Sequence, residues 1–97
     1  MFIGVLSVKL NLPEVHNLKE KRQIIQSIIG RTHSHYKNVS VAEIDYQDLW
    51  QSTLIGIVSI SNEAANLQKI LTKILNFINE SQSDFVLEDH KIEIQHW

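Results

Sequence analysis

The sequence predicts an α+β fold in which two helices cover one face of a four-stranded antiparallel sheet. Two observations predict it. Apolar segments typical of strands occur four times along the chain, and two longer segments between them repeat apolar residues at helical spacing. The length of 97 residues, the apolar fraction of 43% and the charged fraction of 21% are those of one ordinary globular domain. We therefore expect a single domain over residues 1–97.

The first half of the chain begins with a strand that leads into a helix. Residues 2–10 are mostly β-branched or aliphatic, and their polar side chains fall in one parity, as in a strand. Asn17 and Glu20 have the spacing of a capping box, and apolar residues then recur every three or four positions. This pattern predicts a helix over residues 18–36.

The second half holds three strands and one helix. Residues 38–45 and 52–60 are expected as the second and third strands, and the third is apolar in both parities, as a central strand is. Residues 61–63 are a favourable helix start, and the apolar stripe that follows predicts a helix to about residue 80. A turn is expected at residues 81–83. Residues 91–96 alternate, with charged or polar side chains in one parity, which predicts a charged edge strand.

The order of these elements is β-α-β-β-α-β. Right-handed crossovers then favour one arrangement, a sheet with strand order 4-1-3-2 and both helices on one face, which is the ferredoxin-like fold. In this topology the end of the first strand, the start of the first helix, the connection between the second and third strands and the start of the fourth strand meet at one end of the sheet.

The charge of the chain is small but unevenly distributed. The net charge is −2, yet residues 1–42 hold six Lys and Arg against two acidic residues, whereas residues 43–97 hold three against nine. The negative total disfavours non-specific nucleic-acid binding, and the simplest interpretation of the asymmetry is a solvated surface. There is no Cys, no apolar run of membrane-spanning length and no signal peptide, so we expect a cytoplasmic protein without contact to membranes.

The residue types needed for catalysis are not found in recognisable arrangements. No phosphate-binding glycine loop, nucleophile elbow or metal-binding motif occurs in the sequence. His33 and His35 lie two positions apart on a helix and so point in different directions, which makes a metal site unexpected. Asp45 and Asp48 would be ionised beside cations, which does not suit a general acid. We expect no enzyme, no catalytic residue, no metal and no cofactor.

A cluster of cations at the start of the first helix needs an electrostatic partner. Lys19, Lys21 and Arg22 lie where the helix dipole disfavours each cation by about 0.3–1 kcal/mol. The simpler explanation is structural, because Asp45 and Asp48 come from the same end of the sheet and could form ion pairs with the helix.

The alternative partner for these cations is a ligand. Free N–H groups of a helix N-terminus together with Lys21 and Arg22 favour a phosphate or carboxylate, and Trp50 would add a stacking surface. The third strand offers no aromatic ring to a base, so any RNA contact is expected through the basic first helix. The residues of this anion- or RNA-binding hypothesis are Lys19, Lys21, Arg22, Arg31 and Trp50.

The sheet face away from the helices is expected to be apolar. The residues expected beneath the helices are Leu6, Val8, Leu54, Val58 and Ile60. The residues expected on the open face are Ile3, Val5, Ile55 and Ile57. Soluble monomers seldom expose such a patch, so we expect a homo-oligomer, most simply a dimer, formed through this face.

Three segments together carry a family resemblance: GVLSVKLNLP in the first strand, NLKEKR at the first helix start and VAEIDYQDLWQ before the third strand. SNEA at the second helix start fits as well. They resemble the YlxP-like family of small bacterial proteins, a domain family of unknown function. The resemblance implies the ferredoxin-like fold, and because genes of the family often lie among translation and ribosome-maturation genes, it also implies an RNA- or ribosome-associated role. The residues shared with the family are Lys19, Lys21, Arg22, Asp45, Asp48 and Trp50.

Three functions therefore remain open from the sequence. The first is a non-enzymatic accessory protein that contacts structured RNA or a ribosomal subunit through the start of the first helix. The second is a regulatory module that binds a small anionic ligand at that helix N-terminus. The third is a purely structural homo-oligomer whose charges pair internally.

Overall fold

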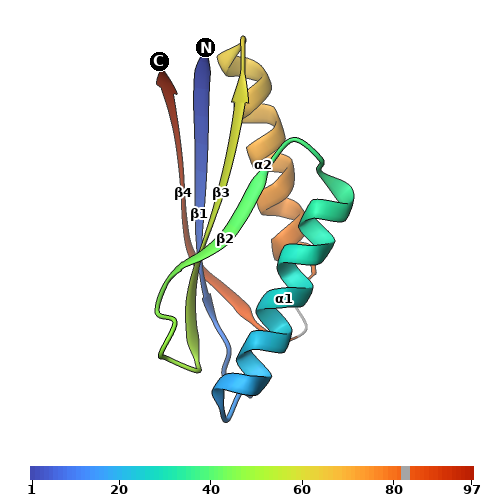
Figure 1. Ribbon diagram of the computed structural model, residues 1–97, viewed down its shortest axis with the longest axis vertical. Coiled ribbons are helices and arrows are strands. Elements are labelled where there is room, and N and C mark those ends of the chain that lie inside the picture. Colours follow the sequence, from blue (N-terminus) through green and yellow to red (C-terminus); the bar gives the residue numbers. More distant parts are fainter. Residues whose placement is uncertain (82–83) are drawn as a thin grey trace.

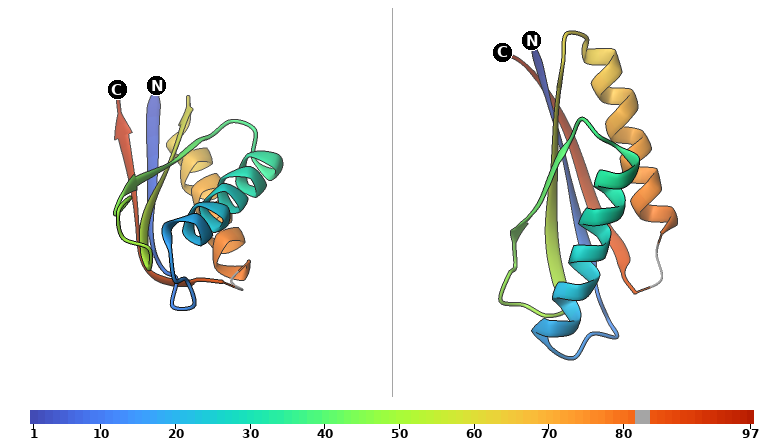
Figure 2. Two further views of the ribbon diagram at one scale, coloured as in Figure 1. Left: turned by 60° about the horizontal axis from the view of Figure 1, so that its bottom comes forward. Right: turned by 45° about the vertical axis from the view of Figure 1, so that its right-hand side comes forward.

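The protein has the predicted ferredoxin-like arrangement. The computed structural model describes residues 1–81 and 84–97, so part of the turn expected at residues 81–83 lies outside the described residues. The elements are, in order, β1 (Phe2–Asn11), α1 (Leu18–His35), β2 (Ser40–Asp45), β3 (Ser52–Ser61), α2 (Ala64–Glu80) and β4 (Val86–His96). The four strands form one antiparallel sheet in the order β2-β3-β1-β4, and both helices lie against the same face (Figure 1). Figure 2 shows the other face of the sheet without a covering layer.

Helix α1 begins at the capping box that the sequence predicts. The Glu20 backbone N–H donates to Asn17 Oδ1 at 2.9 Å, and the His16 backbone N–H donates to Glu20 Oε2 at 3.1 Å. These bonds satisfy backbone donors that a helix start leaves unpaired. One stripe of α1 is buried against the sheet, and it consists of Lys21, Ile25, Ile28 and Thr32.

Helix α2 packs closely on β1 because β1 carries a glycine beneath it. A Cβ atom on Gly4 would lie only 2.8 Å from Leu71 Cδ1 and 3.3 Å from Leu67 Cβ. The absence of a side chain therefore sets the distance between the helix and the strand. The buried stripe of α2 consists of Leu67, Leu71, Ile74 and Ile78. Within the described residues, no helix is long and apolar enough to cross a membrane.

The two faces of β1 agree with the sequence prediction. Leu6 and Val8 are fully buried beneath the helices, and Ile3 and Val5 lie on the open face with partial exposure. The prediction succeeds because the polar residues of this strand, Ser7 among them, fall in one parity and mark the open side.

For β3 the prediction of which residues face the helices is wrong, because the two faces of the strand are interchanged. Ile55 and Ile57, expected on the open face, are 0% exposed and face the helices. The antiparallel register pairs Leu6 with Ile57 and Val8 with Ile55, and residues opposite one another in a ladder share a face. The residues that point to the open side in their place are Leu54, Val58 and Ile60.

Two polar residues explain why the parity of β3 is hidden in the sequence. Thr53 and Ser59 lie on the helix side, and both are buried. Each has a partner, because Thr53 Oγ1 donates to Glu43 Oε2 and Ser59 Oγ donates to the Asn38 carbonyl oxygen at 2.8 Å. A buried hydroxyl with a hydrogen bond is tolerated in a core, so polarity does not mark the exposed side of this strand.

Candidate functional site at the start of helix α1

The end of β1, the start of α1 and the β2–β3 connection meet at one end of the molecule, as predicted (Figure 1, bottom). The Leu12 backbone N–H donates to the Gln51 carbonyl oxygen at 2.9 Å, and Gln51 Nε2 donates to the Val15 carbonyl oxygen at 3.2 Å. The start of β4 is also here, since Val86 pairs with Asn11. These contacts fix the β2–β3 connection against the segment that leads into α1.

Lys21 is the centre of this region. Its side chain is 2% exposed, and its Nζ donates to the backbone carbonyl oxygens of both Tyr46 and Leu49. The same Nζ lies 3.0 Å from Glu43 Oε2, the oxygen that also accepts from the Thr53 hydroxyl. Three acceptors surround one ammonium group, which satisfies its three donors. Lys21 is therefore an internal support that joins α1, β2 and the β2–β3 connection.

The backbone of the β2–β3 connection is held in an uncommon conformation. Tyr46 has a φ of 66°, which is the left-handed region that a residue with a side chain seldom adopts. The Leu49 backbone N–H donates to the Tyr46 carbonyl oxygen at 3.0 Å and closes a turn, and Asp45 Oδ1 accepts from the Tyr46 backbone N–H at 2.8 Å. The turn therefore directs the carbonyl oxygens of Tyr46 and Leu49 toward the ammonium group of Lys21.

The ends of this turn expose two large apolar side chains. Leu49 is 53% exposed and Trp50 is 49% exposed. They line a shallow hollow of about 390 Å³ together with Asp48, Gln51 and Ser52. Half of the Trp50 side chain lies in solvent, so the indole is presented at the surface and does not serve as a buried lid.

The acidic partner of Lys21 differs from the one the sequence suggested. Asp45 and Asp48 were expected to form ion pairs with Lys21 or Arg22, but in the described part of the chain neither carboxylate lies within ion-pair distance of a Lys or Arg. Glu43 takes this role because it shares the helix-facing parity of β2 with Val41. In the sequence, the signal for this pair is that Glu43 lies two positions after Val41, on the apolar side of β2. A carboxylate on the buried side of a strand is expected to have a cationic partner.

The N-terminus of α1 is occupied by its own side chains. The Glu20 carboxylate accepts from the backbone of His16 and from Asn17 Nδ2, so a negative charge already lies where a bound anion would sit. Lys19 and Arg22 are exposed, and over the described ranges no hydrogen bond or ion pair engages either side chain. The structure thus leaves two free cations here and weighs against a small anion enclosed at the helix end.

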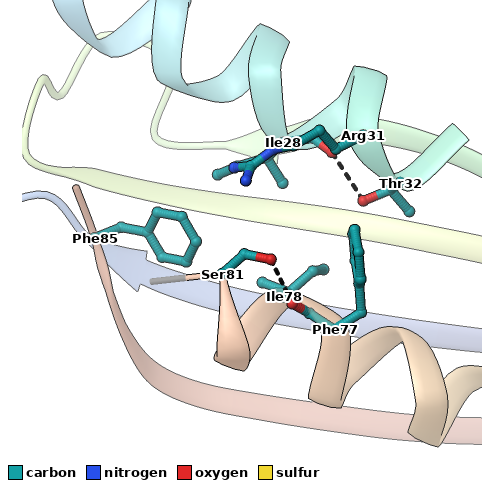
Figure 3. Close-up of a pocket in the computed structure, with 7 residues that line it drawn as sticks. All are labelled: Ile28, Arg31, Thr32, Phe77, Ile78, Ser81 and Phe85. Carbon is teal, nitrogen blue, oxygen red and sulfur yellow. Dashed lines mark hydrogen bonds between the residues drawn. The ribbon is translucent and has the colours of Figure 1, made fainter. Parts of the chain in front are cut away.

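Arg31 lies on a different side of α1 from Arg22. Nine residues separate them, which is about two and a half helical turns, so the two side chains leave the helix on opposite flanks. Arg31 lines a hollow between α1 and α2 together with Ile28, Phe77 and Phe85 (Figure 3). The hollow that these residues line leaves no room for a water molecule. Arg31 therefore does not share a surface with Arg22 at the start of α1.

The histidines form no metal centre in the described structure. In residues 1–81 and 84–97 there is no group of three or more His, Cys, Asp or Glu side chains that could hold a metal ion. The ring of His35, an exposed residue at the end of α1, lies 4.6 Å from the ring of Phe77 of α2, centroid to centroid.

Charge is separated between the two layers of the fold. The helices carry six basic residues and two acidic ones, a net charge of +4, whereas the strands carry two basic and five acidic residues, a net charge of −3. The connections carry one basic and four acidic residues, a net charge of −3, so the strands and the connections share the negative charge and the helices hold the positive charge. One of the six helical cations, Lys21, is buried and paired with Glu43, so the other five give the helical layer its exposed positive charge.

Comparisons with known proteins identify a family. A family described as "Protein of unknown function (DUF503)" matches residues 3–92. The "Uncharacterized protein YlxP" of Bacillus subtilis (strain 168) is 36% identical over 77 residues, which cover 79% of this chain and 83% of that protein. The solved structure "De novo designed protein Foldit4" covers 100% of this chain and 99% of its own with a TM-score of 0.56, and at 11% identity this likeness shows the fold alone. The resemblance expected from the sequence is confirmed, and the chain belongs to the DUF503 family of proteins of unknown function.

Proposed function

We propose that this chain is a non-enzymatic accessory protein of the cytoplasm that binds structured RNA, on ribosomal subunits or their precursors, through the start of α1. The proposed contact is the α1-end surface, which we define as Lys19, Arg22, Leu49 and Trp50. The observation that carries the proposal is the loop held by Lys21: a buried lysine fixes a strained turn whose large apolar side chains lie in solvent. Backbone strain that the surroundings over-determine is typical of binding sites.

The residue types of the α1-end surface suit RNA. Lys19 and Arg22 are one helical turn apart, free of protein partners among the described residues, and able to contact successive phosphates. An exposed indole stacks on an unpaired base, which contributes about 1–3 kcal/mol per base in single-strand binders. The positive helical layer adds long-range attraction. Arg31 lies outside this surface and is assigned no part in the contact.

The first experiment asks whether ribosomal RNA is the partner and whether the α1-end surface binds it. The chain is added to purified ribosomal subunits and to lysate with and without ribonuclease, and the bound fraction is measured by pelleting at several salt concentrations. We expect ribonuclease-sensitive association that weakens with salt. The double variant Lys19→Glu/Arg22→Glu should bind weakly, with a plot of log affinity against log salt that is shallower by about 1.5.

The matched control reverses two cations of the same layer. Lys69→Glu/Lys73→Glu makes the same change in net charge on the exposed side of α2. It should retain most of the affinity for ribosomal subunits, because the proposal assigns the contact to α1. An equal loss of affinity in the two double variants would show only general attraction of cations to a polyanion. A Lys19→Glu/Arg22→Glu variant with unchanged affinity would exclude the α1-end surface as the RNA contact.

A second variant separates binding from folding. Trp50→Ala should lower the free energy of unfolding by about 1–3 kcal/mol and leave the chain folded, because only about half of the side chain is buried. It should weaken RNA binding about tenfold or more through the loss of stacking. Urea denaturation and the pelleting assay measure the two effects on the same sample. A variant that binds as tightly as the natural chain removes Trp50 from the contact.

A further inference from the structure

The open face of the sheet carries an apolar groove that the proposed RNA contact does not use. The groove has a volume of about 320 Å³. Its walls are almost entirely apolar and come from β1, β2 and β3. Ile44 lies across its floor, where its Cγ1 would be 2.8 Å from a Cβ atom on Gly56. Exposed apolar side chains beside it include Val58 and Ile60.

The register of the strands arranges this face in rows of different height. In one row Val5 of β1 lies beside Val58 of β3, and these two branched side chains form a ridge. In the next row Ser7 lies beside Gly56, and Gly56 lies beside Ala42 of β2, so three small residues form a trough that the exposed Ile44 side chain crosses above Gly56. A ridge and a trough therefore lie next to one another on the same face.

The same two rows carry opposite charges on the edge strand. Glu93 is the β4 neighbour of Val5, and Lys91 is the β4 neighbour of Ser7. Both side chains are exposed, with Lys91 Nζ 2.8 Å from Glu93 Oε1. The hydrogen bond and the negative charge of Glu93 raise the pKa of Lys91 above its usual value. The ridge row thus ends in an anion and the trough row ends in a cation.

We propose that a second copy of this chain packs on the open face, related by a two-fold axis that runs across the strands between the ridge row and the trough row. This axis places the ridge of Val5 and Val58 over the trough of the second copy, and the reverse, with the exposed Ile44 side chain turned aside from Gly56 to admit Val58. It also places Lys91 of each copy opposite Glu93 of the other, so that two ion pairs form at the rim. Sheets stacked in this way lie about 10 Å apart, a separation that these side chains fill.

Self-complementarity is the reason to assign a second copy to this face. A two-fold interface requires that one patch match itself in both shape and charge. Here one axis satisfies both requirements, because the high row carries the negative charge and the low row carries the positive charge. The proposal goes beyond the RNA contact and does not depend on it, since the open face and the α1-end surface share no residue.

The first test is the mass in solution. Sedimentation equilibrium of the natural chain at micromolar concentrations should show a dimer. Val58→Glu places a charge on the ridge at a position 39% exposed, so it should leave the fold intact and give a monomer. The matched control Ala65→Glu adds the same charge on α2, on the opposite layer, and should remain a dimer. Circular dichroism of each variant checks that it folds.

The second test asks whether Lys91 and Glu93 meet across the interface. Lys91→Glu and Glu93→Lys each place like charges opposite one another and should weaken the dimer about tenfold or more. An equimolar mixture of the two variants should form a heterodimer at least as tight as the natural dimer, because all charges across the interface then have opposite signs. Within each variant chain, positions 91 and 93 still carry the same charge in the mixture. Recovery of the dimer affinity therefore has to come from charge pairs between the two chains.

Three outcomes would overturn the proposal. A natural chain that stays monomeric at the highest concentration examined has no such interface. A dimer that Val58→Glu leaves unchanged is formed elsewhere, for example by pairing of the β4 edges, which would also bring Lys91 and Glu93 together. A mixture of the two charge variants that does not associate excludes the stated two-fold axis.

Discussion

At the scale of single residues, Lys21 decides what the charged start of α1 can do. A buried ammonium group is costly unless its donors are satisfied, and here two carbonyl oxygens and one carboxylate satisfy them. Hydrogen bonds that involve a charged group contribute about 1.5–3 kcal/mol each, which outweighs the strain of about 1–3 kcal/mol for one left-handed residue. Of three neighbouring cations, one is thus structural and two remain for a partner.

Removal of the Lys21 ammonium group should destabilise the fold, because the Glu43 carboxylate then has no cationic partner. Lys21→Met should lower the free energy of unfolding by about 3–5 kcal/mol, because Glu43 becomes a largely buried charge without a partner. The double variant Lys21→Met/Glu43→Gln should recover part of this loss. Urea denaturation of the two single variants and the double variant gives the coupling between the residues. A loss below about 1 kcal/mol for Lys21→Met is incompatible with the role assigned here.

At the start of α1, the sequence predicts the position of Lys21 but not the partners of its ammonium group. Helical spacing places Lys21 and Arg22 at the edges of the apolar stripe and predicts that both are held in position. This prediction is confirmed for Lys21, which is buried, and wrong for Arg22, which is exposed and has no side-chain partner among the described residues. The identity of the acidic partner of Lys21 was wrong, because Asp45 and Asp48 stand out as loop acids whereas Glu43 is hidden within a strand. The two carbonyl acceptors were beyond prediction, since the conformation of a loop backbone leaves no trace in residue types.

At the scale of elements, the sequence pattern predicts where the strands lie in the chain, but it does not always predict which side of a strand faces the helices. The existence and order of all six elements follow from apolar periodicity and capping residues, and the strand order follows from crossover handedness. Strand β1 has a readable parity because one side is polar. Strand β3 is apolar on both sides, so only its pairing with β1 decides that Ile57 is buried and Val58 is not.

The two strand glycines should therefore respond differently to the same substitution. Gly4→Ala should destabilise the fold by about 1–3 kcal/mol, because its new methyl group would meet the fully buried Leu71. Gly56→Ala should cost about 0.5 kcal/mol or less, because the atom it meets belongs to Ile44, whose side chain is exposed and can move. Thermal unfolding of both variants tests the assignment of the two faces, and the reverse ranking would contradict it.

At the scale of the whole molecule, the two layers present different surfaces. The helical layer is basic, and the open face of the sheet is apolar in its centre. Binding through phosphates weakens with salt because counterions are released, whereas burial of apolar surface does not depend on that release. The two proposals thus assign one surface of the chain to an anionic polymer and another to a second copy of the chain.

The two surfaces should be separable by variants and by salt. Val58→Glu should abolish the dimer and leave a single chain that still binds RNA, and Lys19→Glu/Arg22→Glu should lose RNA and remain a dimer. Raising the salt concentration should release RNA before it dissociates the dimer. Sedimentation velocity with labelled RNA follows both species in one experiment. Loss of both activities in either variant would show that the surfaces are coupled.

The contact between Lys21 and the β2–β3 connection also determines when the loop can open. The amide of Leu49 donates to Tyr46, and the oxygens of both residues are bound to a side chain of α1, so the loop is released only if that contact breaks. We expect the Leu49 amide to exchange with deuterium as slowly as the hydrogen-bonded amides in the second turn of α1, and far faster in Lys21→Met. A loop ordered before its partner arrives loses little conformational entropy on binding, so its side chains recognise a shape without having to form one.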